Sequence, residues 1–174
     1  MRSCSASSRD YVNREVILKK YWPLFVVILV SIWGAFSLAS PYSFLMPIVM
    51  HYFMGIFFLL FFMLKFMDLN GFAKGFQMYD LLAKKSKGYA YVYPFLELFL
   101  ATGYLTFYAP FWIYCFTVIL MVFSAIGVLI ALKQGLDVKC ACMGTVLNVP
   151  LSTVTLTEDL GMASMAIILI LMLL

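Results

Sequence analysis

The stretch FWIYCFTVILMVFSAIGVLIAL, residues 111–132, decides the fold class, because it contains no charged side chain. A helix needs about 20 predominantly apolar residues to cross a bilayer, and this stretch has that length and composition. The whole chain of 174 residues is 65% hydrophobic and only 11% charged, whereas soluble domains carry about 25% charged residues. The sequence therefore predicts an all-α membrane protein.

Four further apolar stretches predict spanning helices, so we expect about five in total. The stretch 89–108 is separated from 111–132 only by Ala109 and Pro110, which predicts a tight helical hairpin. Residues 1–20 form a basic tail, and we expect the first apolar stretch to be a retained helix rather than a cleaved signal peptide. The four stretches cover residues 21–39, 46–67, 89–108 and 157–174.

The 12 Lys and Arg residues are distributed so that all of them can lie on one side of a membrane. They fall in the tail 1–20, the region 65–87 and the segment 133–139, while the two remaining connections carry none. Positive residues favour the cytoplasm. We therefore expect an inner (cytoplasmic) membrane protein whose N-terminus and Cys140 segment are cytoplasmic and whose C-terminus is outside. The net charge of +4 then reflects topology, with lipid rather than nucleic acid as the partner.

Residues 68–88 are not apolar enough to span. Large apolar side chains recur there at helical spacing among lysines, which predicts an amphipathic helix in the membrane interface or, alternatively, a plain connector. Near the start of the last apolar stretch, Thr155 and Glu158 fit a capping box, in which the Thr155 side chain accepts a hydrogen bond from the Glu158 amide. Glu158 and Asp159 are then explained as charges at the positive end of the helix dipole.

Cys140 and Cys142 are the residues that a lipid environment does not explain. Side chains two apart on an extended chain point to the same side, so the two thiols can act together. They could cycle between dithiol and disulfide, or bind a soft ion such as Cu(I), Hg(II) or Zn(II). Two unreactive loop cysteines are the remaining interpretation. A cytoplasmic position favours metal handling or reductant exchange over a stable disulfide, because the cytosol is reducing.

Glu97 places a carboxyl group inside the stretch 89–108, where a charge near the bilayer centre costs about 2.5–3.5 kcal/mol. It should therefore face the bundle, and Lys65, near the same end of the preceding span, is the predicted partner. The pair is either a structural ion pair or a proton or cation relay. His51, the only histidine, lies near the opposite end of that span. It is interpreted as an interfacial histidine bonded to a neighbour, or as a relay or metal ligand apart from Cys140.

Several enzyme classes leave motifs that this sequence lacks. It has no glycine-rich loop for phosphates and no nucleophile elbow. With a single histidine it cannot form a multi-histidine haem or metal site. These features argue against ATP-driven transport by this chain alone and leave a soft metal ion as the one cofactor or cargo that the cysteines suggest.

Four motifs occur in a fixed order from about residue 46 to the C-terminus, and the elements Pro-x-x-Glu and Cys-x-Cys-x-Gly are the most specific among them. The motifs are KFMDLNGF at 65–72, YDLLAK at 79–84, YPFLE at 93–97 and CACMG at 140–144. In this order and spacing the chain resembles the MauE branch of the DoxX-like membrane proteins.

The resemblance implies a four-helix bundle over residues 46–174, to which the helix 21–39 is an addition. It implies a redox accessory role, in which Cys140 and Cys142 exchange disulfides with a thioredoxin-like protein during maturation of partner proteins, as in methylamine utilisation. It also assigns the family's glutamate to Glu97. Five-helix versions resemble proteins found with heavy-metal domains, so a soft-metal carrier served by a metal-binding chaperone is the alternative. A non-catalytic membrane assembly factor is the third possibility.

Overall fold

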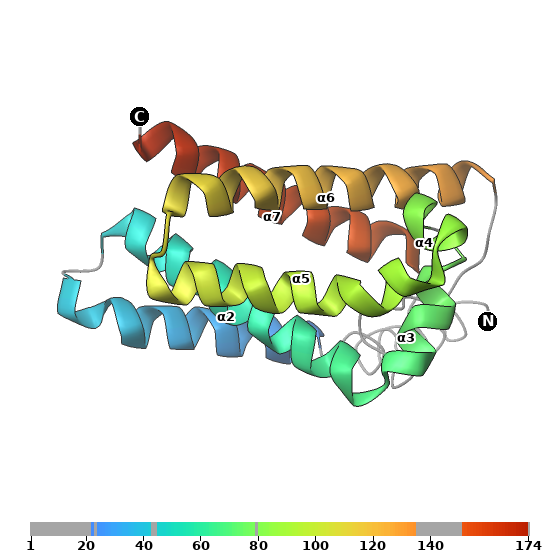
Figure 1. Ribbon diagram of the computed structural model, residues 1–174. Helices are drawn as coiled ribbons and strands as arrows, with labels where there is room; N and C mark the ends of the chain where they lie inside the picture. Colours follow the sequence, from blue (N-terminus) through green and yellow to red (C-terminus); the bar gives the residue numbers. More distant parts are fainter. Residues whose placement is uncertain (1–21, 23, 43–44, 79, 135–150, 174) are drawn as a thin grey trace, which may run out of the picture.

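The computed structural model describes residues 22, 24–42, 45–78, 80–134 and 151–173. Within these residues the chain is helical and has no strand, which confirms the predicted all-α class. Figure 1 shows long antiparallel helices side by side, with short helices gathered at one end. The long helices are α2 (Met46–Met67), α5 (Lys87–Thr106), α6 (Pro110–Lys133) and α7 (Leu151–Leu173), and the N-terminal helix (Leu24–Ala39) lies beside α2.

Among the described residues, three helices are long and apolar enough to cross a membrane: α2, α6 and the part of α7 from Thr155 to Leu173. The helices α2 and α6 have 22 and 24 residues, so at about 1.5 Å per residue each exceeds the roughly 30 Å hydrocarbon core. The N-terminal helix is apolar but shorter, and a 3-10 turn, η1 (Ser40–Tyr42), follows it.

The helix α5 is less apolar because Lys87, Glu97 and several tyrosines lie within it. It nevertheless packs against α2 along the bundle and has a similar length of 20 residues (Figure 1). Since α6 pairs with α7 in the same way, the bundle consists of two antiparallel pairs of helices, α2 with α5 and α6 with α7. The helix α5 therefore runs beside the candidate span α2, although it is not itself among the three described helices apolar enough to cross a membrane.

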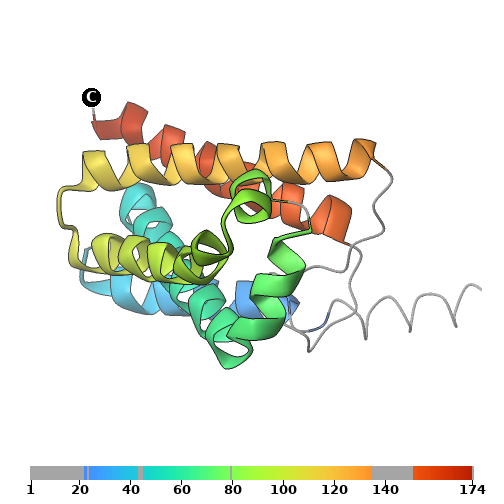
Figure 2. The ribbon, with the colours of Figure 1, turned by 45° about the vertical axis from the view of Figure 1, so that its right-hand side comes forward.

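The connection between α2 and α5 forms two short helices rather than the single amphipathic helix that we expected. They are α3 (Leu69–Phe76) and α4 (Leu81–Lys85), and Figure 2 shows both in green at the same end of the bundle. Asp80 causes the break, because its carboxylate accepts hydrogen bonds from the amides of Leu82 and Ala83 and so starts a new helix. The apolar face of α3 is buried against the bundle, as the periodicity predicted.

The last helix begins earlier than predicted. It starts at Leu151 rather than near residue 157. Thr155 and Glu158 therefore lie inside the helix, and the predicted capping box is wrong. Glu158 and Asp159 need another explanation than the helix dipole.

The helices α5 and α6 are joined by a short turn. Phe107 and Ala109 both adopt positive φ, at 52° and 42°, so the chain reverses within three residues between Thr106 and Pro110. Non-glycine residues adopt this left-handed conformation only at an energetic cost. The predicted hairpin between the third and fourth spans is confirmed.

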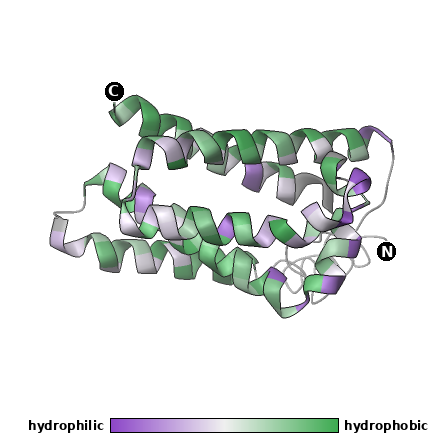
Figure 3. Ribbon diagram, in the orientation of Figure 1, coloured by the Kyte–Doolittle hydropathy of each residue, from purple (hydrophilic) through white to green (hydrophobic). Residues whose placement is uncertain are grey.

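Charged side chains gather at one end of the bundle, which we call the lysine-rich end. Figure 3 shows hydrophilic residues around α3, α4 and the end of α6, while the helices between the two ends are mostly hydrophobic. The opposite end holds the start of α2 and the α5–α6 turn. The lysines of the described residues, all on elements that meet at the lysine-rich end, are Lys65, Lys74, Lys84, Lys85, Lys87 and Lys133.

Candidate functional site

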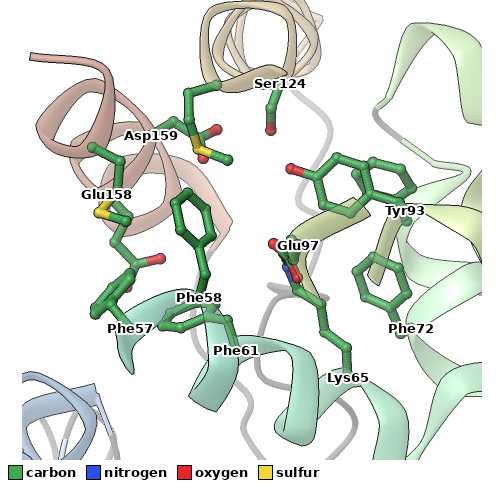
Figure 4. A pocket seen from close by; sticks show the side chains of 13 residues that line it. Phe57, Phe58, Phe61, Lys65, Phe72, Tyr93, Glu97, Ser124, Glu158 and Asp159 are labelled. Atoms are coloured by element: carbon green, nitrogen blue, oxygen red, sulfur yellow. Dashed lines mark hydrogen bonds and ion pairs between the residues drawn. The ribbon is translucent and has the colours of Figure 1, made fainter. Parts of the chain in front are cut away.

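A cavity lies inside the bundle toward the lysine-rich end, where five helices converge (Figure 4). The centre of a water molecule can occupy a volume of about 20 Å³ inside it, which is room for about one water. We call it the central cavity. Its lining residues are Phe57, Phe58, Phe61 and Lys65 of α2, Phe72 and Phe76 of α3, Tyr93 and Glu97 of α5, Met121 and Ser124 of α6, and Glu158, Asp159 and Met162 of α7.

The ion pair of Lys65 and Glu97 lies at the centre of this cavity. The Lys65 ammonium donates a hydrogen bond to Oε1 of Glu97, and both residues are only 3% exposed. The predicted partner of Glu97 is therefore confirmed. Each buried ion loses several kcal/mol of hydration, and the mutual attraction offsets that loss only while both partners are present.

Aromatic rings complete the surroundings of Lys65. Its Nζ lies 5.5, 5.3 and 5.0 Å from the ring centres of Phe61, Phe72 and Tyr93. At such distances the negative faces of the rings attract the cation. The rings come from α2, α3 and α5, so the short helix α3 closes one side of the space around the Lys65 ammonium.

Glu97 retains unused hydrogen-bonding capacity. Its Oε2 is buried and has no hydrogen-bond partner among the described residues. Pro94, one turn earlier in α5, has no amide hydrogen and so leaves the Ala90 carbonyl without its usual helical donor. A water molecule in the central cavity would satisfy Oε2, since buried waters typically bond to such atoms.

The sequence reasoning missed the acidic contribution of α7 to this cavity. Glu158 and Asp159 line it together with Glu97, and Ser124 adds a hydroxyl group from α6 (Figure 4). Asp159 is 8% exposed, which a residue of a solvated first turn would not be. A signal was present in the sequence, because two adjacent acids inside an apolar stretch are costly unless they face the bundle interior.

His51 lies in a separate neutral network near the opposite end. It is 1% exposed, so it is buried rather than interfacial, and its Nδ1 is 2.8 Å from the Tyr114 hydroxyl. The Phe107 ring stacks on it at a centroid distance of 3.9 Å. Fourteen residues of α2 separate His51 from Lys65, or about 21 Å along the helix axis. The prediction that His51 bonds to a neighbour is confirmed.

Cys140 and Cys142 lie outside the described residues. The described chain ends at Gln134, just after α6, and resumes at Leu151, where α7 begins. Both of these ends are at the lysine-rich end of the bundle (Figure 1). Cys115 is a half-buried free thiol within α6. Among the residues that the structure describes, no group of three or more His, Cys, Asp and Glu side chains is arranged to hold a metal ion.

The sequence model of one family, methylamine utilisation protein MauE, matches residues 43–173. The chain belongs to the MauE family. Searches of curated proteins and of solved structures gave no match. The MauE match confirms the predicted family and supports a multi-pass membrane accessory protein in general terms. It includes all residues of the Lys65–Glu97 pair and the central cavity, whereas the N-terminal helix precedes the matched range.

Proposed function

We propose that this MauE-family protein is a membrane redox accessory protein that exchanges disulfides through Cys140 and Cys142. One observation carries the proposal: the segment containing both thiols connects the end of α6 to the start of α7, and both of these helix ends lie at the lysine-rich end of the bundle. Covalent geometry limits the reach of Cys140 from Lys133 to about 25 Å. Because α6 itself is about 36 Å long, the pair can act only toward this end.

The proposed exchange is a two-electron reaction. A thiolate of the reduced partner attacks the Cys140–Cys142 disulfide and forms a mixed disulfide, releasing the other cysteine as a thiolate. The second partner thiolate then attacks the partner sulfur of the mixed disulfide and releases the remaining cysteine of the pair as a thiolate, so the partner becomes a disulfide and the pair a dithiol. Two electrons and two protons pass from partner to pair, and a thioredoxin-like protein is the proposed partner class. The reverse direction uses the same steps.

A soft-metal carrier is the second candidate, and the charge distribution favours it. The described lysines are gathered at one end, which supports a cytoplasmic position for that end by the positive-inside rule. A reducing cytosol keeps thiols free, so the pair is available there to bind Cu(I) or Hg(II). A non-catalytic assembly factor would need neither thiol.

Trapping of mixed disulfides tests the redox proposal. In a Cys4→Ser, Cys115→Ser background only the pair remains, and removing one member should leave the other unable to resolve its mixed disulfide. We expect either Cys140→Ser or Cys142→Ser to accumulate an adduct with a cellular protein on non-reducing gels after acid quenching. Cys140→Ser, Cys142→Ser should give no adduct. If neither single variant forms one, the redox proposal is wrong.

Two further measurements separate the alternatives. Stoichiometric Cu(I) or Hg(II) binding that needs both cysteines, without adducts, would establish the metal carrier instead. Unchanged partner maturation in the double variant would establish the assembly factor. For orientation, a membrane-impermeant maleimide should label Cys140 and Cys142 only after cells are lysed, and labelling of intact cells would reverse the proposed topology.

A further inference from the structure

A second, larger cavity opens between the N-terminal helix, α2 and α7, and we call it the groove. It has a volume of about 370 Å³, which lies within the range of small-molecule sites, about 300–1,000 Å³. Its walls are mostly apolar, but Glu158 of α7 also borders it. The apolar walls are Leu24 and Ile28 of the N-terminal helix, Phe53 and Phe57 of α2, and Met162 and Met165 of α7.

The sequence of the N-terminal helix explains why the groove lies where it does. Near the opposite end, the helix packs closely on α2 through the small residues Ala35 and Ala39, which contact Val49. A Cβ added at Gly34 would lie 2.7 Å from the Ile56 side chain, so the backbones approach closely there. Toward the other end, the larger residues Leu24 and Ile28 hold the helix away from α7 and leave the groove between them.

Glu158 distinguishes the groove from an ordinary lipid-facing surface, because it borders the groove on one side and the central cavity on the other. It lies seven residues into α7, about 10 Å from the helix start. A phospholipid seated here would bring its phosphate toward Glu158 and Asp159, where like charges repel. An anionic headgroup is therefore disfavoured in the groove.

The apolar walls favour a flat ring. Phe53 and Phe57 stack on each other at a centroid distance of 5.6 Å and form one side. Met162 and Met165 supply thioethers on α7, and sulfur makes favourable contacts with rings. Gly161 leaves space between the walls, since a Cβ added there would meet no atom within 4 Å.

We propose that the groove binds the head ring and first tail units of a lipid-soluble quinone. A neutral ring with carbonyl groups and an apolar tail matches the rings, the thioethers, the volume and the hydroxyl group of Thr157. The N-terminal helix supplies one wall and precedes the residues that match the MauE family, so the site belongs to this chain's additional helix.

The role of the quinone rests on the proposed function, although its binding does not. As the oxidant of the reduced pair, the quinone would accept two electrons and two protons to become a quinol, while the Cys140 and Cys142 dithiol becomes a disulfide. The reaction is balanced without a further reactant. Thr157, which also lines the groove, would donate a hydrogen bond from its hydroxyl group to a ring carbonyl.

Binding is tested with the full chain in nanodiscs of quinone-free phosphatidylcholine, with a decyl-substituted benzoquinone as the probe. Quenching of tryptophan fluorescence reports its affinity. Gly161→Leu fills the groove and should weaken binding at least tenfold, and Thr157→Val, which removes the hydroxyl donor, should weaken it several-fold. The matched control is Gly88→Leu, at an exposed glycine of α5 whose surroundings also leave room for a side chain. It should bind like the wild type.

Each outcome decides the proposal. If Gly161→Leu does not keep the wild-type thermal unfolding temperature, Gly161→Ala and Thr157→Val carry the comparison. Equal quinone binding by all variants would mean that the groove holds acyl chains only. The same conclusion would follow if Gly161→Leu abolished quenching by spin-labelled phosphatidylcholine while the quinone bound all variants alike. In another outcome, the double variant Cys140→Ser, Cys142→Ser retains quinone binding while the wild type forms no disulfide when quinone is added. That result would contradict the redox function and still support the binding site.

Discussion

The two ends of the bundle bury polar side chains in opposite ways. At the lysine-rich end the buried groups are ionisable and include Lys65 and Glu97, within a cavity that has room for water. Near the opposite end they are neutral: His51 bonds to Tyr114, and the Tyr104 hydroxyl donates to Thr117 at 3.1 Å. The charged set is costly to bury, whereas the neutral network is closely packed and hydrogen-bonded.

This difference indicates where the molecule can do chemistry. A neutral network of rings and hydroxyl groups fixes the packing of α2, α5 and α6, and the Phe107 ring covers it. Within the described residues, both sets keep an unbonded buried atom, Oε2 of Glu97 in the charged set and Nε2 of His51 in the neutral network, so the charges of the first set are what distinguish it. The charged set also lies at the end where the cysteine-containing segment is attached. The two halves of the bundle thus differ in the charge of their buried groups, and the proposed chemistry belongs to the charged half.

The largest expected effect comes from separating the buried ion pair. Lys65→Met should destabilise the protein by about 3–5 kcal/mol, because Glu97 would remain as an uncompensated buried charge. The double variant Lys65→Met, Glu97→Met should recover most of that loss, since apolar residues of similar size often replace a buried pair without penalty. Unfolding by denaturant in detergent micelles measures both values.

The double variant also separates structure from function at this end. If it is stable but fails to mature partner proteins, Glu97 acts in the mechanism, and if it remains active, the pair only holds α2 against α5. A double variant as unstable as Lys65→Met would show that the pair is not the dominant interaction at this end.

At the opposite end the expected effect is smaller. Tyr114→Phe leaves the buried His51 Nδ1 without its hydrogen-bond partner and should destabilise the protein by about 1–3 kcal/mol. Tyr108→Phe removes a hydroxyl from a tyrosine that is 73% exposed and should change stability little. Denaturant unfolding of the two variants under identical conditions measures the difference. Equal stability would mean that the neutral network does not contribute to the fold.

The smallest effect is expected at Asp80, which caps α4 outside the membrane-spanning helices. Asp80→Ala removes the acceptor for the amides of Leu82 and Ala83 and should cost about 1 kcal/mol, while Asp80→Asn keeps it. Burial raises the pKa of Asp80 above its ordinary value. The folded protein therefore binds this proton more tightly than the unfolded chain, and the resulting stability is lost as pH rises through the folded-state pKa.

The comparison with Asp80→Asn isolates that titration. Relative to this variant, the wild type should be most stable at low pH and become less stable as pH rises above the ordinary pKa of an aspartate. Thermal unfolding across that range measures the difference. A constant difference between the two proteins would show that the Asp80 carboxylate is not desolvated.

Much of the fold could be predicted because lipid imposes simple rules. The limits of α2 match the apolar run 46–67, and the hairpin followed from Ala109 and Pro110. The partner of Glu97 could also be predicted, since a charge at that depth needs an opposite charge from a neighbouring helix.

The acidic side of the central cavity could not be predicted in the same way. The capping pattern at Thr155 already explained Glu158 and Asp159 as residues of a helix start. Only the position of α7 in the bundle shows that they face inward. A capping role would expose Glu158 and Asp159 to solvent, whereas a position inside the bundle buries them. The local sequence around Thr155 does not distinguish these two surroundings. The break at Asp80 was missed because the apolar periodicity continues across it.

The short turn between α5 and α6 has a consequence for how the protein is made. With its lysine, glutamate and tyrosines, α5 is too polar to be an efficient membrane insertion signal alone. In contrast, the most apolar 18 residues of α6 have a mean hydropathy of 2.7. The strained turn at Phe107 and Ala109 leaves almost no chain between them. During synthesis, α5 is therefore expected to wait until α6 emerges from the ribosome, and the two helices to enter the bilayer together.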